Sequence, residues 1–174
     1  MRSRRRRGNE RGAVLVEFAL VAPLLFLLLF GIIDFSLVMF SYISVRQGTS
    51  AGAREASVMA TNPPPSQTCT TSGTFTGEAN NLICYTKSHI GLAQSQVRVS
   101  IWFSSTNGYK AGDPVVVCTQ YKASSTTRFF SSLLNNVVLT SKVEVRIEST
   151  DANLTQPAQE TALSGSWPSS CTSA

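Results

Sequence analysis

The chain has 174 residues, of which 43% are hydrophobic and 14% charged, so it can bury one modest core and is neither a multidomain enzyme nor a disordered chain. The net charge of +5 comes from the first twelve residues, where six arginines stand against one glutamate, and the remainder is neutral. A protein that binds nucleic acid along its folded surface needs basic residues spread over that surface, so this distribution excludes a basic nucleic-acid-binding domain.

An apolar segment follows the arginines. Between Ala13 and Phe40 only Glu17 and Asp34 are charged. This length and composition predict a helix that crosses a membrane. Because the arginines lie on one side only, the positive-inside rule keeps the N-terminus in the cytoplasm and predicts that the chain beyond Phe40 is exported.

Three kinds of N-terminus are compatible with a basic and then apolar start. A cleaved secretory signal needs a small-x-small cleavage site close to its apolar stretch, but the nearest one, Ala51-Gly52-Ala53, lies well beyond it. A plain signal anchor gives no reason for Glu17, because an ionisable group inside a membrane costs a few kcal/mol. Glu17 therefore needs another explanation.

The third kind begins at Gly12. The run from Arg11 to Phe18 resembles the cleavage site of a prepilin, which has a basic leader ending in Gly, four apolar residues, and then Glu and an aromatic residue. Over residues 11–58 the chain resembles the TadE-like minor pilins (pseudopilins) of bacterial tight-adherence (Tad/Flp) pilus systems. The matching features, in chain order, are Glu17-Phe18-Ala19-Leu20, Pro23, Asp34 and Gly52-Ala53-Arg54-Glu55-Ala56.

This resemblance implies processing and assembly. A prepilin peptidase would cut after Gly12 and leave Ala13 as the new N-terminus. In related filaments the carboxylate corresponding to Glu17 meets the N-terminal amine of a neighbouring subunit, which would offset the cost of holding both charges in a low dielectric. The alternative is that Glu17 merely reaches the cytoplasmic interface. The implied partners are the prepilin peptidase, other pilins, the pilus assembly platform and membrane lipid.

Pro23 and Asp34 interrupt the apolar stretch. Pro23 removes one backbone hydrogen bond and is predicted to kink the helix, either to help helices pack in a filament or as a tolerated membrane proline. Asp34 lies near the outer edge of the stretch. We expect it to face water or headgroups rather than a buried contact between subunits.

The helix is predicted to continue to Ala60, because the first breaker is Asn62-Pro63-Pro64-Pro65, and it would be about 72 Å long. Small residues from Gly48 to Ser57 allow another backbone or a sheet to approach closely. Arg54 and Glu55 are adjacent and so point to different sides of the helix. A solvated surface and a packing role both remain open for them.

The rest of the chain predicts a small α+β domain with an antiparallel sheet and short helices. A Pro/Ser/Thr-rich loop from Pro63 to Phe75 leads into a helix from Thr76 to about His89, which Gly91 ends. Alternating apolar residues at 97–103 and 115–121 predict a β-hairpin, with turn residues Asn107-Gly108 and Gly112 between the strands.

The later segments are less regular. Residues 129–138 have the spacing of an amphipathic helix that packs on the core. Residues 142–148 alternate in the pattern of a strand with one wet face. The Ser/Thr-rich tail from Ser149 is predicted to be irregular, although Trp167 and Cys171 suggest that it is held in place.

Cysteine use agrees with export. All four cysteines follow the apolar segment, in a compartment that permits disulfides. Three pairings are possible, and sequence order favours Cys69 with Cys84 and Cys118 with Cys171. The chain has no C-x-x-C pair and only one histidine, His89, which argues against a zinc site.

The sequence supplies no constellation for catalysis. A Ser-His-Asp triad would have to use His89, and no G-x-S-x-G motif accompanies any serine. No spacing singles out two carboxylates, and Gly-rich phosphate loops are absent. We therefore expect no catalytic residue, no metal and no cofactor.

These observations predict four segments: a basic leader at 1–12, a transmembrane and extended helix at 13–61, an exported α+β domain at 62–148 and a tail at 149–174. The chain would be a single-pass protein of the bacterial inner membrane that could also be assembled into an extracellular pilus. The predicted function is that of a minor pilin in a tight-adherence system. The alternative is a single-pass, membrane-anchored extracytoplasmic binding module.

Overall fold

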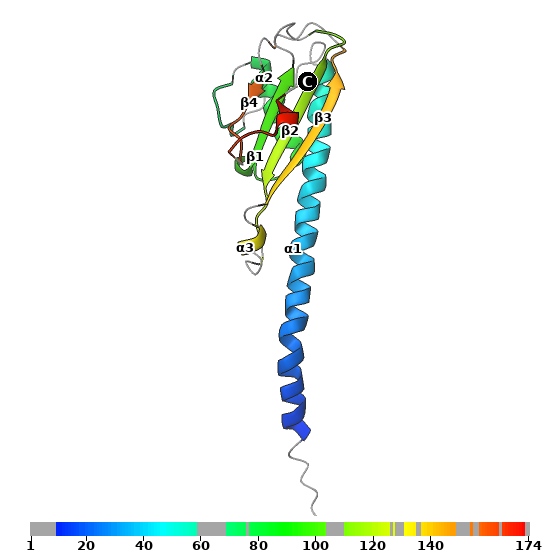
Figure 1. Cartoon of the computed structure of the whole chain (residues 1–174), viewed down its shortest axis with the longest axis vertical. Helices are drawn as coiled ribbons and strands as arrows, with labels where there is room; N and C mark the ends of the chain where they lie inside the picture. The colour runs from blue at the N-terminus through cyan, green and yellow to red at the C-terminus, as the bar shows by residue number, and fades with distance from the viewer. Residues whose placement is uncertain are drawn as a thin grey trace, which may run out of the picture.

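The computed structural model describes residues 10–58, 69–75, 77–103, 110–125, 127, 131–134, 137–148, 154, 157–163 and 165–172. Most of the predicted leader, the proline run and the turn at Asn107-Gly108 lie outside these residues. A long helix carries a small α+β domain beside its C-terminal part, and its N-terminal part projects far beyond that domain (Figure 1). The predicted fold class, a long apolar helix followed by an α+β domain with an antiparallel sheet, is confirmed.

Helix α1 (Glu10–Val58) has 49 residues and is about 73 Å long. It includes Pro23 and ends two residues before the predicted end at Ala60, where Met59 and Ala60 lie outside the described residues. From Gly12 to Ile33 no residue is buried. We call the part from Ala13 to Ile33 the projecting segment. By length and hydropathy, α1 is the one helix in the described part of the chain that is long and apolar enough to cross a membrane.

The sheet has four antiparallel strands in the order β3-β2-β1-β4. Strands β1 (Val97–Phe103) and β2 (Pro114–Lys122) form the predicted hairpin, with Val97 opposite Tyr121 and Phe103 opposite Val115. Strand β3 (Val138–Arg146) extends the sheet beside β2, and the short β4 (Ala158–Gln159) pairs with β1. The tail is therefore less irregular than predicted, because part of it adds an edge strand.

Two layers cover the sheet. The face that carries Val99, Ile101 and Val117 packs against α1 and α2 (Gly77–Ile90) and forms the main core. The opposite face carries Val116 and Cys118, and the C-terminal tail covers it with Trp167 and Cys171. The domain thus uses its last residues as the second layer of the sheet.

The helix predicted for residues 129–138 is wrong at its C-terminal end. Helix α3 is only Ser131–Leu134, and Val138 already begins β3 opposite Lys122. The backbone N–H of Ala123 donates to the carbonyl of Val137, so the ladder with β2 competes for the residues that helical spacing assigned to the helix. The β-branched Val137 and Val138 suit a strand better than a helix.

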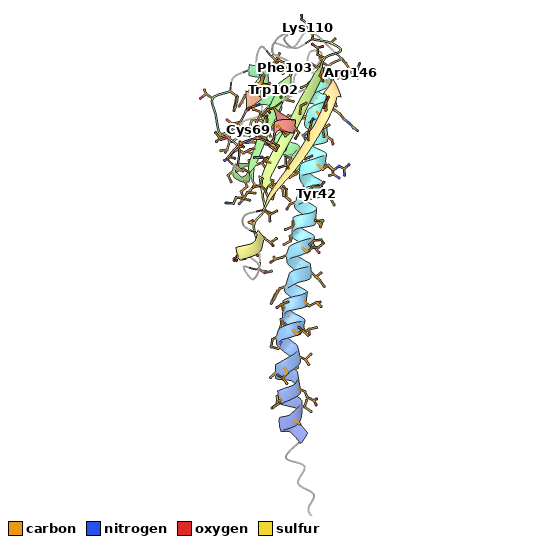
Figure 2. The ribbon with its side chains drawn as sticks, in the orientation of Figure 1. Tyr42, Cys69, Trp102, Phe103, Lys110 and Arg146 are labelled. Atoms are coloured by element: carbon orange, nitrogen blue, oxygen red, sulfur yellow. A yellow bond between two sulfur atoms is a disulfide. The ribbon has the colours of Figure 1, made fainter. Side chains whose placement is uncertain are left out.

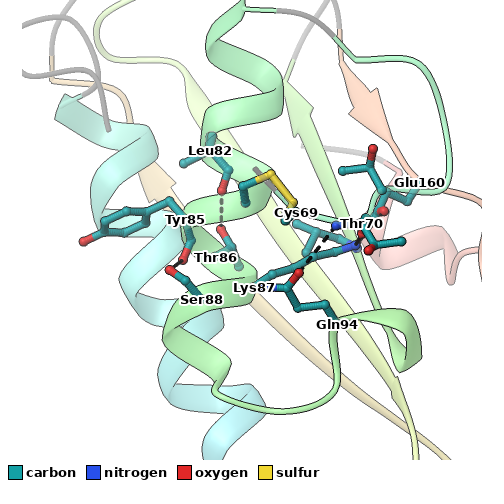
Figure 3. Close-up of a disulfide and its surroundings, with 12 residues drawn as sticks. Cys69, Thr70, Leu82, Tyr85, Thr86, Lys87, Ser88, Gln94 and Glu160 are labelled. Atoms are coloured by element: carbon teal, nitrogen blue, oxygen red, sulfur yellow. Dashed lines mark hydrogen bonds and ion pairs between the residues drawn. A yellow bond between two sulfur atoms is a disulfide. The ribbon is translucent and has the colours of Figure 1, made fainter. Parts of the chain in front are cut away.

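Two disulfides join Cys69 to Cys84 and Cys118 to Cys171, with Cα–Cα distances of 5.4 and 5.7 Å. This is the pairing that sequence order favours. The first joins the loop before α2 to α2 itself (Figure 3). The second ties the tail to the central strand β2.

Candidate functional site

Beyond the projecting segment, one face of α1 packs against the rest of the chain. From Val45 onward its buried residues recur at intervals of three or four positions, as expected for one side of a helix, and Asp34 is buried eleven residues before Val45. They are Asp34, Val45, Gly48, Thr49, Gly52, Ala53 and Ala56. We call these residues the packed face of α1.

The two glycines of the packed face bring α2 into direct contact with α1. A Cβ atom at Gly48 would overlap Ile90 and would lie 2.8 Å from its backbone nitrogen, and one at Gly52 would overlap Thr86. Gly48 and Gly52 are four residues apart, as are Thr86 and Ile90 in the reverse order, so the two helices run in opposite directions. The predicted close approach at the small residues is confirmed, and its partner is α2 together with the sheet.

Asp34 is the first residue of the packed face and its only charged one. Its side chain is 2% exposed. The Ser125 hydroxyl donates to Oδ2 at 2.9 Å, the Thr127 hydroxyl donates to the same oxygen at 2.5 Å, and the Thr127 backbone N–H donates to Oδ1 at 3.3 Å. We call these three residues the Asp34 clamp.

The clamp corrects the expectation that Asp34 faces water or headgroups. The segment after β2 descends along α1 and supplies three donors to one carboxylate, which compensates for the loss of hydration on burial. Ser125 and Thr127 lie 91 and 93 residues after Asp34 in the sequence. No local sequence pattern therefore indicates this contact. A carboxylate at the end of an apolar run is held by the chain's own polar groups rather than by solvent.

The residues predicted to act in processing and assembly all lie on exposed turns of α1. Gly12, Ala13, Glu17, Phe18 and Pro23 are all exposed. A Cβ atom at Gly12 would meet nothing within 4 Å. The structure therefore leaves this end of the helix open to other molecules.

Arg54 and Glu55 lie near the other end of α1. Arg54 is exposed and Glu55 is partly buried, as their adjacency predicts. Arg54 lines an open groove of about 490 Å³ on the outer side of the helix, and Tyr42, labelled in Figure 2, lies at the other end of the same groove. The remaining lining residues are Ile43, Arg46, Gln47, Ser50 and Ala51.

Sequence reasoning missed a buried ion pair. The Lys87 ammonium on α2 donates to Glu160 Oε1 at 2.7 Å, and both side chains are 0% exposed (Figure 3). Glu160 also accepts from the backbone N–H groups of Ser72 and Val99, and Lys87 donates to the carbonyl of Thr70. The pair thus connects α2, the disulfide loop, β1 and the tail.

Burial lowers the pKa of Lys87 below its ordinary value of 10.5, and the hydrogen bond and charge of Glu160 offset this only in part. One signal in the sequence pointed to Lys87. It lies four residues after Ile83 and three before Ile90, a position where helical periodicity calls for an apolar side chain. No comparable signal marked Glu160 in the tail.

Comparison with known proteins identifies one segment. Residues 12–54 match the family model described as TadE-like protein. No curated protein and no solved structure matches the chain. The match begins at Gly12, ends at Arg54 and lies entirely within α1. The resemblance predicted from the sequence is therefore confirmed over residues 12–54, where the chain is similar to the TadE-like family.

Proposed function

We propose that this chain is a minor pilin, or pseudopilin, that takes part in assembling a tight-adherence pilus. The observation that carries the proposal is the coincidence of the TadE-like match with an apolar helix whose first turns are wholly exposed. Such a helix needs either lipid or neighbouring helices around it. A subunit that is first held in the membrane is surrounded by lipid, and the same subunit is surrounded by neighbouring helices once it enters a filament.

In this proposal the chain crosses the bacterial inner membrane once. The arginine-rich leader at 1–12 stays in the cytoplasm, and the domain beyond α1 is exported, where its two disulfides form. A prepilin peptidase cuts after Gly12, and the subunit then contacts other pilins and the assembly platform. Its role is structural, and the leader and processing site follow the TadE-like resemblance.

The test is the N-terminus of the protein isolated from its native membrane, read by intact mass. We expect the chain to start at Ala13. A chain that retains Met1 would favour the membrane-anchored binding module instead. A start beyond Ala51 would make the protein a secreted one and would overturn the proposal.

A variant sharpens this test. Gly12→Leu should block processing, and because space around Gly12 is open, the substitution should leave the fold intact. Gly8→Leu, the same change within the leader, is the matched control and should be processed normally. Normal cleavage of both variants would contradict a peptidase site at Gly12.

A further inference from the structure

The C-terminal tail joins the domain in two places, which belong to different clusters of buried side chains. Its first part supplies Leu154 and Ala158 to the main core and Glu160 to the buried pair with Lys87. Its last part, residues 165–172, packs on the opposite face of the sheet, where the red end of the chain crosses β2 (Figure 1). We call residues 165–172 the latch.

The cluster of side chains under the latch is small. Three residues are buried in it, and two tryptophans pack against them: Val116, Cys118, Cys171, Trp102 and Trp167. Two of the three buried residues are the cysteines of one disulfide. The described latch residues contribute no side chain to the main core on the other face. The two faces of the sheet are therefore packed independently of each other.

The tail is held in place just before the latch begins. The Leu163 backbone N–H donates to the side-chain oxygen of Gln120 at 2.9 Å, and Gln120 is 1% exposed. Gly165, the first residue of the latch, has a φ of +80°, in the left-handed region that glycine adopts without strain. A held residue followed two positions later by such a glycine forms a hinge. The latch can move about this hinge while Leu163 stays in place.

Two contacts between the latch and the rest of the domain differ in kind. The Trp167 ring N–H donates to the carbonyl of Glu160 at 2.8 Å, and Cys171 is bonded covalently to Cys118. A hydrogen bond contributes modestly to stability, because water replaces the lost partner when the contact opens. The disulfide has no such substitute. We therefore expect the covalent bond to decide whether the latch stays on the sheet.

From these observations we propose that the latch is a redox-sensitive closure, which closes over the sheet when Cys118 and Cys171 are oxidised and stays open while they are reduced. Closing forms one S–S bond from two thiols, and the two electrons and two protons pass to an external disulfide, which becomes two thiols. The main core stays folded in both states. The closure does not depend on the pilin role.

Burial of the bond makes the closure one that acts once. Cys118 and Cys171 are 0% and 1% exposed when the latch is closed. A dithiol reductant must contact a sulfur atom to break the bond, so it can act only after the latch has lifted. In the proposed function the chain meets an oxidising compartment only after export. The latch would then close outside the cytoplasm and remain closed.

Intrinsic fluorescence reports on the latch without an added probe, because both tryptophans of the chain pack in the cluster under it. The test compares the full chain in detergent with the double variant Cys118→Ala/Cys171→Ala. Cys69→Ala/Cys84→Ala is the matched control, since it also lacks one disulfide but keeps the one at the latch. Far-UV circular dichroism measures whether the rest of the chain stays folded.

Without the latch disulfide, tryptophan emission should shift to longer wavelength and acrylamide should quench it more strongly. The circular dichroism spectrum should not change, and the control should match the unmodified chain in both measurements. Unchanged quenching in the latch variant would mean that the latch stays closed without its bond, and the proposal would be overturned. Loss of the circular dichroism signal would also overturn it, because the latch would then not be separable from the main core.

A second measurement follows closing in the native sequence. The full chain is reduced with a dithiol, freed of it and then oxidised with glutathione disulfide in detergent. Acrylamide quenching should decrease in step with formation of the Cys118–Cys171 bond, which mass spectrometry of peptides detects. A decrease before that bond forms would show that packing alone closes the latch, and the redox role would be refuted. These outcomes are independent of the N-terminus of the mature chain, which tests the pilin role.

Discussion

Two lysine–carboxylate pairs in the C-terminal domain differ in burial. Lys87 and Glu160 are 2.7 Å apart and fully buried, whereas Lys142 and Glu144 are 3.2 Å apart with side chains 33% and 50% exposed. Loss of one partner of a buried pair leaves an uncompensated charge and costs about 3–5 kcal/mol. An exposed pair contributes about 0–1 kcal/mol. We therefore expect the buried pair to contribute more than the exposed pair to holding the tail against the domain.

Lys87→Met should lower the free energy of unfolding by about 3 kcal/mol, the lower end of the range, because Glu160 keeps two backbone donors. Lys142→Met is the control and should change it by less than about 1 kcal/mol. Urea unfolding of the full chain in detergent measures both. Equal shifts of the two midpoints would contradict the structural role of the buried pair.

The same variant has a pH signature. Because burial lowers the pKa of Lys87 below 10.5, the unfolded chain binds this proton more tightly than the folded chain does. The contribution of Lys87 to stability therefore rises as the pH increases from its lowered pKa toward 10.5. Lys87→Met should remove that rise when unfolding is compared at neutral and alkaline pH.

At the scale of elements, the junction between α1 and α2 depends on the absence of side chains. Gly48 lies against the backbone of Ile90, and Gly52 lies against the side chain of Thr86. Glycine in a helix interior costs about 1 kcal/mol relative to alanine, so these positions trade helix propensity for close packing. The family match covers both glycines, although it does not extend to α2.

Gly48→Ala should destabilise the domain by about 1–3 kcal/mol, despite the better helix propensity of alanine, because the new methyl group meets backbone atoms that cannot rotate away. Gln47→Ala, one residue earlier and exposed, is the control and should have little effect. Thermal unfolding followed by circular dichroism compares them. An unchanged midpoint for Gly48→Ala would show that α2 can shift along α1.

At the scale of the whole molecule, assembly should depend on Glu17. This carboxylate is exposed on the projecting segment, so Glu17→Ala should leave folding and membrane insertion intact. Incorporation into pili should fall, because the pairing with a neighbouring N-terminal amine is lost. Immunoblots of sheared filaments measure incorporation, with Val16→Ala as the control. Normal piliation with Glu17→Ala would refute the pairing.

Apart from the Cys118–Cys171 disulfide, whose cysteines are 53 residues apart, the features that were predicted correctly from the sequence are local ones. The apolar run predicted α1, and two stretches of alternating apolar residues separated by turn residues predicted the β1–β2 hairpin. Each of these patterns depends only on one element or on two that are adjacent in the sequence. The Asp34 clamp joins residues 91 and 93 positions apart, and the Lys87–Glu160 pair joins residues 73 positions apart. Such contacts depend on how elements dock. The short α3 was mispredicted for the same reason, since pairing with β2 overrides the helical spacing of Val137 and Val138.

The distribution of covalent bonds has a mechanical consequence. Both disulfides lie in the part of the chain that follows α1, so they brace the domain against stretching but do not fasten it to the helix. The helix is held by the Asp34 clamp and by the buried residues from Val45 to Ala56, which follow one another along the helix axis. A pulling force along that axis loads these contacts in shear. Many of the contacts must then break at the same time, whereas a force across the axis would break them one after another. A subunit drawn out of a membrane by its helix would carry its domain along as a rigid load.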